Sequence, residues 1–122
     1  MSGRRVVLVV DDESITRDVV GAMLALENVD VHTAHDGETA LAKASELHPD
    51  LVLLDIMMPG LDGIEVCRRL QANGAPRVVM LSARTDAEAK RAAAEAGAAG
   101  YLVKPFSAVD LFDVVEGRGR GA

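Results

Sequence analysis

The sequence predicts an α/β fold in which five parallel strands form a doubly wound sheet with helices on both faces. Short apolar runs of strand length alternate five times with longer segments of helical periodicity. This alternation indicates strand–helix units joined by right-handed crossovers, which build a parallel sheet. The run at residues 51–54 is apolar at every position, as expected for a central strand covered on both faces. A chain of 122 residues with 49% hydrophobic residues has room for one such domain.

Charge and composition argue against several classes of protein. With 13 Lys and Arg against 19 Asp and Glu, the net charge is -6, whereas nonspecific nucleic-acid binding requires a basic surface. One Tyr, two Phe and no Trp leave few rings for stacking on single strands. Cys67 is the only cysteine, so no internal disulfide indicates an oxidising compartment. The apolar run at residues 6–10 is too short for a signal peptide or membrane span. We therefore expect a cytoplasmic protein that binds neither nucleic acid nor membrane.

The first strand–helix unit begins with a β-branched run at residues 6–10, which we interpret as a buried strand. A helix is predicted from Ser14, which can cap it, to about Glu27. The apolar positions of this helix recur at helical spacing, and they predict its buried face: Ile15, Val19, Ala22, Met23 and Leu26.

The next strand, Val29–Ala34, is partly alternating and is expected near the sheet edge. A turn at residues 36–37 leads to a helix over residues 38–47, which ends before Pro49. The strand at residues 51–55 then ends in Asp55. After the break at residues 59–60, Asp62 and Glu65 have the spacing of a capping box for the third helix, whose apolar face is Ile64, Cys67 and Leu70.

The last two units follow the same plan. A strand at residues 78–81 ends at Ser82, and residues 85–88 have a capping-box pattern that opens an alanine-rich helix ending at Gly97. A short strand at residues 101–103 precedes a second capping box at residues 107–110. The apolar face of the final helix is predicted to be Val109, Leu111, Phe112 and Val115. The domain is thus expected over residues 1–117, and the glycine- and arginine-rich residues 118–122 as a tail or the start of a linker.

Polar side chains follow four of the five predicted strands: Asp11 and Asp12, then Asp55, Ser82 and Lys104. The carboxyl ends of parallel strands converge, and ligands bind there. Carboxylates brought this close repel one another, and a bound cation relieves the repulsion. Oxygen donors without nearby His or Cys favour Mg²⁺. Each residue alone has an ordinary interpretation as a helix start, a turn hydroxyl or a solvated lysine, but their combination predicts a site.

The residues at these strand ends resemble those of the receiver domains of response regulators in two-component signalling. The similar motifs are Asp11 and Asp12, residues 55–63 (DIMMPGLDG), residues 82–83 (SA) and residues 104–106 (KPF). The resemblance extends from residue 6 to about residue 116. It implies a flavodoxin-like doubly wound (βα)5 fold with strand order 2-1-3-4-5. It also implies that a sensor histidine kinase phosphorylates the domain, which then controls a partner or a tethered output domain.

The same resemblance assigns roles around the proposed phosphoacceptor, Asp55. Mg²⁺ is expected to bind the side chains of Asp12 and Asp55, the backbone carbonyl of Met57 and, through water, Asp11. An Asp carboxylate can attack phosphorus when the charge on the transferring oxygens is neutralised. The resulting acyl phosphate is labile, which suits a timed signal rather than enzymatic turnover. Met57 and Arg84 flank the expected path of the hydrolytic water, and we hypothesise that their bulk slows its entry.

The remaining implied roles concern the conformational switch. Ser82 is expected to bond a phosphoryl oxygen and Lys104 to pair with the phosphoryl charge. Tyr101 corresponds to the aromatic residue that moves inward as the hydroxyl is drawn toward the phosphoryl group. Pro105 is expected to follow a cis peptide bond. A phosphoryl group shifts such a switch only through its different interaction free energies with the two states.

Other functions remain open at this point. A Mg²⁺-dependent phosphohydrolase with an Asp nucleophile usually has a second carboxylate two residues later, where this chain has Met57. A nucleotide or flavin binder needs a glycine- or hydroxyl-rich loop after the first strand, where this chain is acidic. A receiver used only for docking would lack a site residue. A phosphorylation-dependent homodimer is also a candidate, but residues 98–100, Asp110, Asp113 and Glu116 do not supply the ion pairs of one large subfamily. His32 and His35 are interpreted as solvated, and Cys67 as a buried filler.

Overall fold

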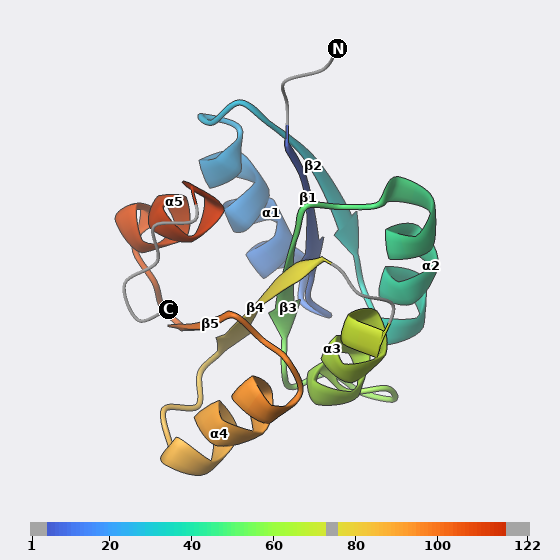
Figure 1. Ribbon diagram of the computed structural model, residues 1–122. Helices are drawn as coiled ribbons and strands as arrows, with labels where there is room; N and C mark the ends of the chain where they lie inside the picture. Colours follow the sequence, from blue (N-terminus) through green and yellow to red (C-terminus); the bar gives the residue numbers. More distant parts are fainter. Residues whose placement is uncertain (1–4, 73–75, 117–122) are drawn as a thin grey trace.

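The computed structural model describes residues 5–72 and 76–116, and these residues form a five-stranded parallel sheet with helices on both faces (Figure 1). The sheet order is β2-β1-β3-β4-β5, as predicted. In chain order the elements are β1 (Arg5–Val10), α1 (Ser14–Leu24), β2 (Val29–Ala34), α2 (Gly37–Leu47), β3 (Leu51–Asp55), α3 (Gly63–Ala72), β4 (Arg77–Ser82), α4 (Ala87–Glu95), β5 (Gly100–Val103) and α5 (Ala108–Glu116). The tail predicted at residues 118–122 lies outside the described residues.

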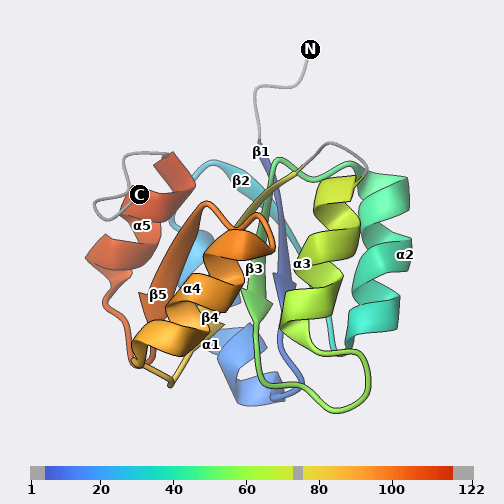
Figure 2. The same cartoon turned by 60° about the horizontal axis from the view of Figure 1, so that its bottom comes forward.

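The helices cover the sheet in two groups. Side chains of α2, α3 and α4 pack with one face of the sheet in one cluster of buried residues, and α1 and α5 pack with the other face in a second. Figure 2 shows α2, α3 and α4 in front of the sheet and α1 behind it. Every residue of β3 is buried, which confirms the prediction from its unbroken apolar run. The sheet therefore has the two covered faces that a doubly wound fold requires.

The strand register brings the polar strand ends together. Val10 of β1 pairs with Leu54 of β3, so the next residue of each strand, Asp11 and Asp55, emerges at the same level of the sheet. Asp55 in turn pairs with Leu81 of β4, which directly precedes Ser82. The connections reverse direction between β1 and β3, and the resulting crevice at their carboxyl ends is where sheets of this type bind ligands.

The predicted buried face of α1 is wrong except at Met23, which is partly buried and packs against the core. Ile15 and Leu26 are 76% and 79% exposed, and Val19 is also exposed, whereas Val20 and Leu24 are fully buried. The helix has apolar residues on two neighbouring faces, and periodicity alone does not decide between them. Residues 17, 20 and 24 share the face toward the sheet, where the Arg17 guanidinium donates to the backbone carbonyl of Asp11 at 2.6 Å. The helix also ends at Leu24, three residues before the predicted end.

Several helix starts also differ from the sequence prediction. Glu13, not Ser14, is the N-cap of α1 and makes no side-chain capping bond. The predicted turn at residues 36–37 is the start of α2, because the Asp36 carboxylate accepts from the Thr39 amide. The N-cap of α4 is Asp86 rather than residue 85.

The predicted caps of α3 and α5 are confirmed. The Asp62 carboxylate accepts from the Glu65 amide, and the Ser107 hydroxyl accepts from the Asp110 amide. On α5, however, Val109 is 65% exposed, and the buried positions are Leu111, Val114 and Val115. No helix within the described residues is both long and apolar enough to cross a membrane.

Candidate functional site

Three carboxylates meet at the carboxyl ends of β1 and β3. Asp11, Asp12 and Asp55 each offer an oxygen, and these oxygens all lie within 4.8 Å of one another. Asp11 is fully buried and Asp55 is 5% exposed, while Asp12 is exposed. Because buried carboxylates are costly unless they are paired or coordinate a cation, this cluster requires a compensating positive charge.

Lys104 supplies part of that charge from the end of β5. Its Nζ atom lies 2.8 Å from Asp11 Oδ2 and 3.5 Å from Asp55 Oδ2. Burial alone would lower the pKa of Lys104, but the hydrogen bond to Asp11 and the charge of Asp55 outweigh it and raise that pKa. The Lys104 ammonium group therefore stays protonated at neutral pH. It lies within 3.5 Å of both the Asp11 carboxylate, which follows β1, and the Asp55 carboxylate, which ends β3.

The surroundings of Asp55 disfavour the charged form of its carboxylate and so raise its pKa. Burial and the negative charge of Asp11 raise the pKa of Asp55 from its ordinary value of 3.8 to about 6, while Lys104 and a hydrogen bond from the Met57 amide act in the opposite direction. A carboxylate that lacks solvation and has few hydrogen bonds is a better nucleophile than a fully solvated one. It is also a group that gains from a nearby cation.

The acidic turn after β1 is fixed by hydrogen bonds on both sides of Asp11. Its Oδ1 accepts from the Glu13 amide at 2.9 Å, and its backbone carbonyl accepts from Arg17. Among the described residues no buried side-chain nitrogen or oxygen lacks a hydrogen-bond partner. The turn is therefore preorganised, with the Asp11 carboxylate aimed at Lys104.

Gly63 allows the start of α3 to lie directly against the backbone of Asp55. A Cβ atom at residue 63 would be 2.2 Å from the carbonyl oxygen of Asp55 and 2.8 Å from the Cα of Ile56. The Gly63 amide also donates to the Ile56 carbonyl at 3.0 Å. Only glycine is compatible with this approach, which fixes the end of β3 and with it the height of the Asp55 carboxylate.

The donor set fits a hard divalent cation. Three carboxylates against one ammonium leave an excess of two negative charges when all four groups are ionised. All the donors are oxygens, which Mg²⁺ prefers. Within the described residues this is the only group of three or more His, Cys, Asp or Glu side chains with such geometry.

The predicted switch residues lie at the end of β4 and on the neighbouring strand β5. Ser82 is fully buried at the end of β4, and its hydroxyl accepts from the Arg84 amide at 3.1 Å. Tyr101 packs partly buried against the core, and its hydroxyl donates to the Arg84 carbonyl at 3.0 Å. The Lys104–Pro105 peptide bond is cis, as predicted. Ser82 and Tyr101 are thus connected through the backbone of one residue, Arg84.

Three contributors to the site were not identified from the sequence: Arg17, Gly63 and Asp86. No sequence feature distinguishes Arg17 from other charged helix residues, although its spacing of six residues from Asp11 places it in the first turn of α1, within reach. Gly63 was included only as part of a motif, since its close contact with Asp55 depends on the path of the chain after Pro59. Thr85 fits the capping-box pattern better than Asp86 does, so the sequence pattern does not single out Asp86.

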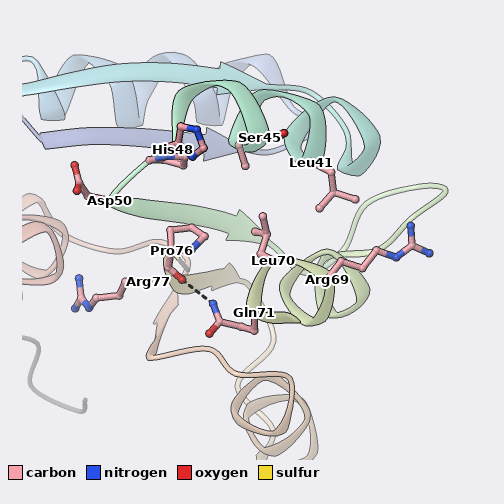
Figure 3. Close-up of a pocket in the computed structure, with 11 residues that line it drawn as sticks. Leu41, Ser45, His48, Asp50, Arg69, Leu70, Gln71, Pro76 and Arg77 are labelled. Atoms are coloured by element: carbon pink, nitrogen blue, oxygen red, sulfur yellow. Dashed lines mark hydrogen bonds between the residues drawn. The ribbon is translucent and has the colours of Figure 1, made fainter. Parts of the chain in front are cut away.

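Other candidate groups have no part in this site. Cys67 is fully buried, and burial raises the pKa of its thiol to about 11, which makes it a poor nucleophile. His35 is largely exposed and pairs with Asp36. A groove of about 1000 Å³ lies at the opposite end of the sheet, where α2 and α3 end and β3 and β4 begin (Figure 3). The groove is separated from the carboxylates by the length of the strands.

Comparisons with known proteins match almost all of the chain. The family model for the response regulator receiver domain matches residues 7–116. The DNA-binding response regulator MtrA of Mycobacterium tuberculosis (strain ATCC 25618 / H37Rv) is 42% identical over 115 residues, which are 94% of this chain and 50% of MtrA. The transcriptional regulatory protein ResD of Bacillus subtilis (strain 168) is 45% identical over 101 residues, which are 83% of this chain and 42% of ResD.

Among solved structures, the signal receiver domain of the response regulator NarL from Mycobacterium tuberculosis has a TM-score of 0.89 and 34% identity, and the match covers 96% of this chain and 98% of that domain. The chain spans about half the length of MtrA and less than half of ResD. What is similar in all three comparisons is therefore the α/β domain described above.

Proposed function

The chain belongs to the family of response regulator receiver domains, and from this premise we propose that a sensor histidine kinase phosphorylates Asp55 and thereby switches the domain's conformation. The observation that carries the proposal is the position of the Asp55 carboxylate. It is buried within 4.8 Å of two further carboxylates and 3.5 Å from the ammonium of Lys104. Such a group can act as a nucleophile toward phosphorus when cations neutralise the transferring oxygens.

In the proposed transfer, one oxygen of Asp55 forms a bond to phosphorus while the bond from phosphorus to the donor breaks. The electron pair of the broken bond leaves with the donor, which is the histidine nitrogen of the kinase or the acetate of acetyl phosphate. Lys104 pairs with the developing negative charge, and the hydroxyl of Ser82 donates to a phosphoryl oxygen. Their positions at the ends of β5 and β4 support these roles.

We propose Mg²⁺ as the cofactor of this step. Its ligands would be the side chains of Asp12 and Asp55, the backbone carbonyl of Met57 and, through water, Asp11. When bound, the ion supplies positive charge to the phosphoryl oxygens. Support comes from the oxygen-only donor set and from the excess of negative charge that Lys104 leaves uncompensated.

A receiver domain is a signalling domain rather than an enzyme with turnover on an external substrate. We propose that its only reactions are its own phosphorylation and the later attack of water on the acyl phosphate, which breaks the phosphorus–Asp55 bond and releases inorganic phosphate. The phosphohydrolase alternative is not favoured, because the family model matches nearly the whole chain and because Met57 occupies the position of the second carboxylate.

The partners follow from the same proposal. A kinase must reach Asp55 from the carboxyl end of the sheet, and exposed apolar side chains occur on α1 and after β3: Ile15, Val19 and Met57. An apolar surface of this kind suits a docking protein. We propose a downstream partner or output domain as the target of the switch, with residues 1–117 as the receiver and residues 118–122 as a tail or linker. A phosphorylation-dependent homodimer remains a further proposal.

The proposal is tested by incubating the protein with acetyl phosphate in Mg²⁺ or in EDTA and then reducing it with borohydride, which converts an aspartyl phosphate into homoserine. Peptide mass spectrometry should locate homoserine at residue 55, and only in the samples that contained Mg²⁺. Modification at another residue, or equal modification in EDTA, would contradict the proposed roles of Asp55 and of the metal.

A further inference from the structure

Arg84 is the residue through which the site hydroxyl, the aromatic side chain on β5 and the start of α4 are connected. Its amide donates to Ser82 Oγ at 3.1 Å, and its carbonyl accepts from the Tyr101 hydroxyl at 3.0 Å. Its guanidinium donates through Nε and Nη2 to the two carboxylate oxygens of Asp86, at 3.0 and 2.8 Å. Both backbone groups and the side chain of Arg84 are therefore engaged, each with a different part of the molecule.

Asp86 carries the connection into α4. It is the N-cap of that helix, and its Oδ2 accepts from the Ala89 amide at 3.1 Å while also accepting from Arg84. The hydrogen bonds from Arg84 hold the pKa of Asp86 down at about 2. The ion pair is thus intact at neutral pH, and one carboxylate serves both the salt bridge and the helix cap.

A second link joins the same helix turn to Tyr101. Lys90 lies in the first turn of α4, and its Nζ atom lies 5.8 Å from the centroid of the Tyr101 ring, within the range of a cation–π interaction. The first turn of α4 is therefore connected to Tyr101 both directly and through Arg84.

The Arg84–Asp86 ion pair lies on the surface, with both side chains about half exposed, but it differs from other surface pairs in what it connects. Glu65 pairs with Arg68 and Arg69 at similar distances, but all three residues belong to α3. Such a pair adds little beyond local helix stability. The Arg84 pair instead connects the loop that follows Ser82 with the N-cap of α4, and its two parallel hydrogen bonds fix orientation as well as distance.

We infer that Arg84 is a positioning residue that transmits the phosphorylation state of Asp55 from Ser82 to the first turn of α4. The inference rests on the proposed function. When the Ser82 hydroxyl is drawn to a phosphoryl oxygen, the Arg84 backbone bonded to it shifts, and the rigid fork on Asp86 moves the helix cap with it. A lysine at this position would keep the charge but lose the fork, and would therefore transmit less.

The test compares the wild type with Arg84→Met, Arg84→Lys and a control, Arg68→Met, which removes an exposed ion-pairing arginine far from Ser82. Phosphorylation by acetyl phosphate in Mg²⁺ is followed by intact mass. The conformational response to beryllofluoride, a mimic of the phosphoryl group on a carboxylate, is followed in two ways. Amide chemical shifts report on residues 87–90, and tyrosine emission reports on Tyr101, since the chain has one Tyr and no Trp.

At saturating beryllofluoride, which does not undergo hydrolysis, the shift response of residues 87–90 should be about fivefold smaller in Arg84→Met than in the wild type, as expected for the loss of a weak coupling. Arg84→Lys should be intermediate, and Arg68→Met should behave as the wild type. A full wild-type response at residues 87–90 in Arg84→Met at saturating beryllofluoride would overturn the inference alone. Absence of phosphorylation in the wild type would overturn the proposed function, and the inference with it.

Discussion

Removing the charge of Asp55 should stabilise the metal-free protein at neutral pH. The substitution Asp55→Asn keeps the size of the side chain and removes the negative charge that Asp11 repels. The pKa of Asp55 is raised from 3.8 to about 6 by burial and by that repulsion. The folded protein therefore binds the Asp55 proton more tightly than the unfolded chain does, and ionisation of this group above pH 6 opposes folding.

The magnitude follows from the two pKa values. A difference of about two units corresponds to about 3 kcal/mol at pH 7, where Asp55 is ionised in both states. The contribution shrinks as the pH falls through 6 and is about 0.5 kcal/mol near pH 4, where the folded protein holds the proton and the unfolded chain, with its ordinary pKa of 3.8, is still a little more than half ionised. Asp55→Asn should therefore raise the free energy of unfolding by about 3 kcal/mol at pH 7 and by little at pH 4.

Urea unfolding in EDTA measures both values, and the difference between variant and wild type at each pH isolates Asp55 from the other carboxylates. A control, Asp18→Asn, removes an equal charge from an exposed position on α1 and should change stability little at either pH. Added Mg²⁺ should stabilise the wild type and so reduce the difference in free energy of unfolding between Asp55→Asn and the wild type. A variant that is less stable than the wild type at pH 7, or equally more stable at both pH values, would refute the reasoning.

Three further predictions concern the neighbours of Asp55. Lys104→Met leaves buried carboxylates without their ammonium partner, so urea unfolding in EDTA should show a loss of about 3 kcal/mol, partly recovered in Mg²⁺; full stability in EDTA would contradict this. Gly63→Ala forces a Cβ against the Asp55 carbonyl and should lower the free energy of unfolding by about 2–4 kcal/mol. The control Gly21→Ala has open space around the new methyl group and should raise the free energy of unfolding by about 0.5–1 kcal/mol, because alanine favours the helix. Met57→Ala should shorten the lifetime of the acyl phosphate, measured by loss of the intact-mass adduct, because the exposed Met57 side chain shields the approach of water; an unchanged lifetime would contradict the hypothesis.

The fold was predictable from the sequence because its central strands, β1, β3 and β4, are mostly buried on both faces. A run such as residues 51–54 has no polar position that would allow another interpretation, and the alternation with helices leaves one common architecture. The meeting of the polar residues at the strand ends was also predictable. Parallel pairing of β1 with β3 sets the register that brings Asp11 beside Asp55.

The errors occurred where local patterns allow two solutions. Residues 15–26 carry apolar side chains on two adjacent helical faces, and only the packing of Val20 and Leu24 against the sheet shows which is buried. Thr85 and Asp86 are likewise both able to cap α4. Asp86 is the cap in the structure, and its carboxylate also pairs with Arg84. Such choices depend on tertiary contacts that a sequence does not display.

The contacts of Arg84 were also not predictable from the sequence, because they depend on the tertiary structure. From the sequence, Arg84 was a bulky residue beside the path of water. In the structure its guanidinium is bound to Asp86 and its backbone to Ser82 and Tyr101. Its contribution to hydrolysis therefore stays a prediction, while its position between the site and α4 is an observation.

The most direct test of the central claim, that Asp55 is the phosphoacceptor, is an intact-mass measurement after incubation with Mg²⁺ and acetyl phosphate. The wild type should gain a single phosphoryl group that is lost on acid treatment, and Asp55→Asn, which is expected to be folded and more stable, should gain none. A wild type without the adduct, or a variant that carries the same adduct, would contradict the claim.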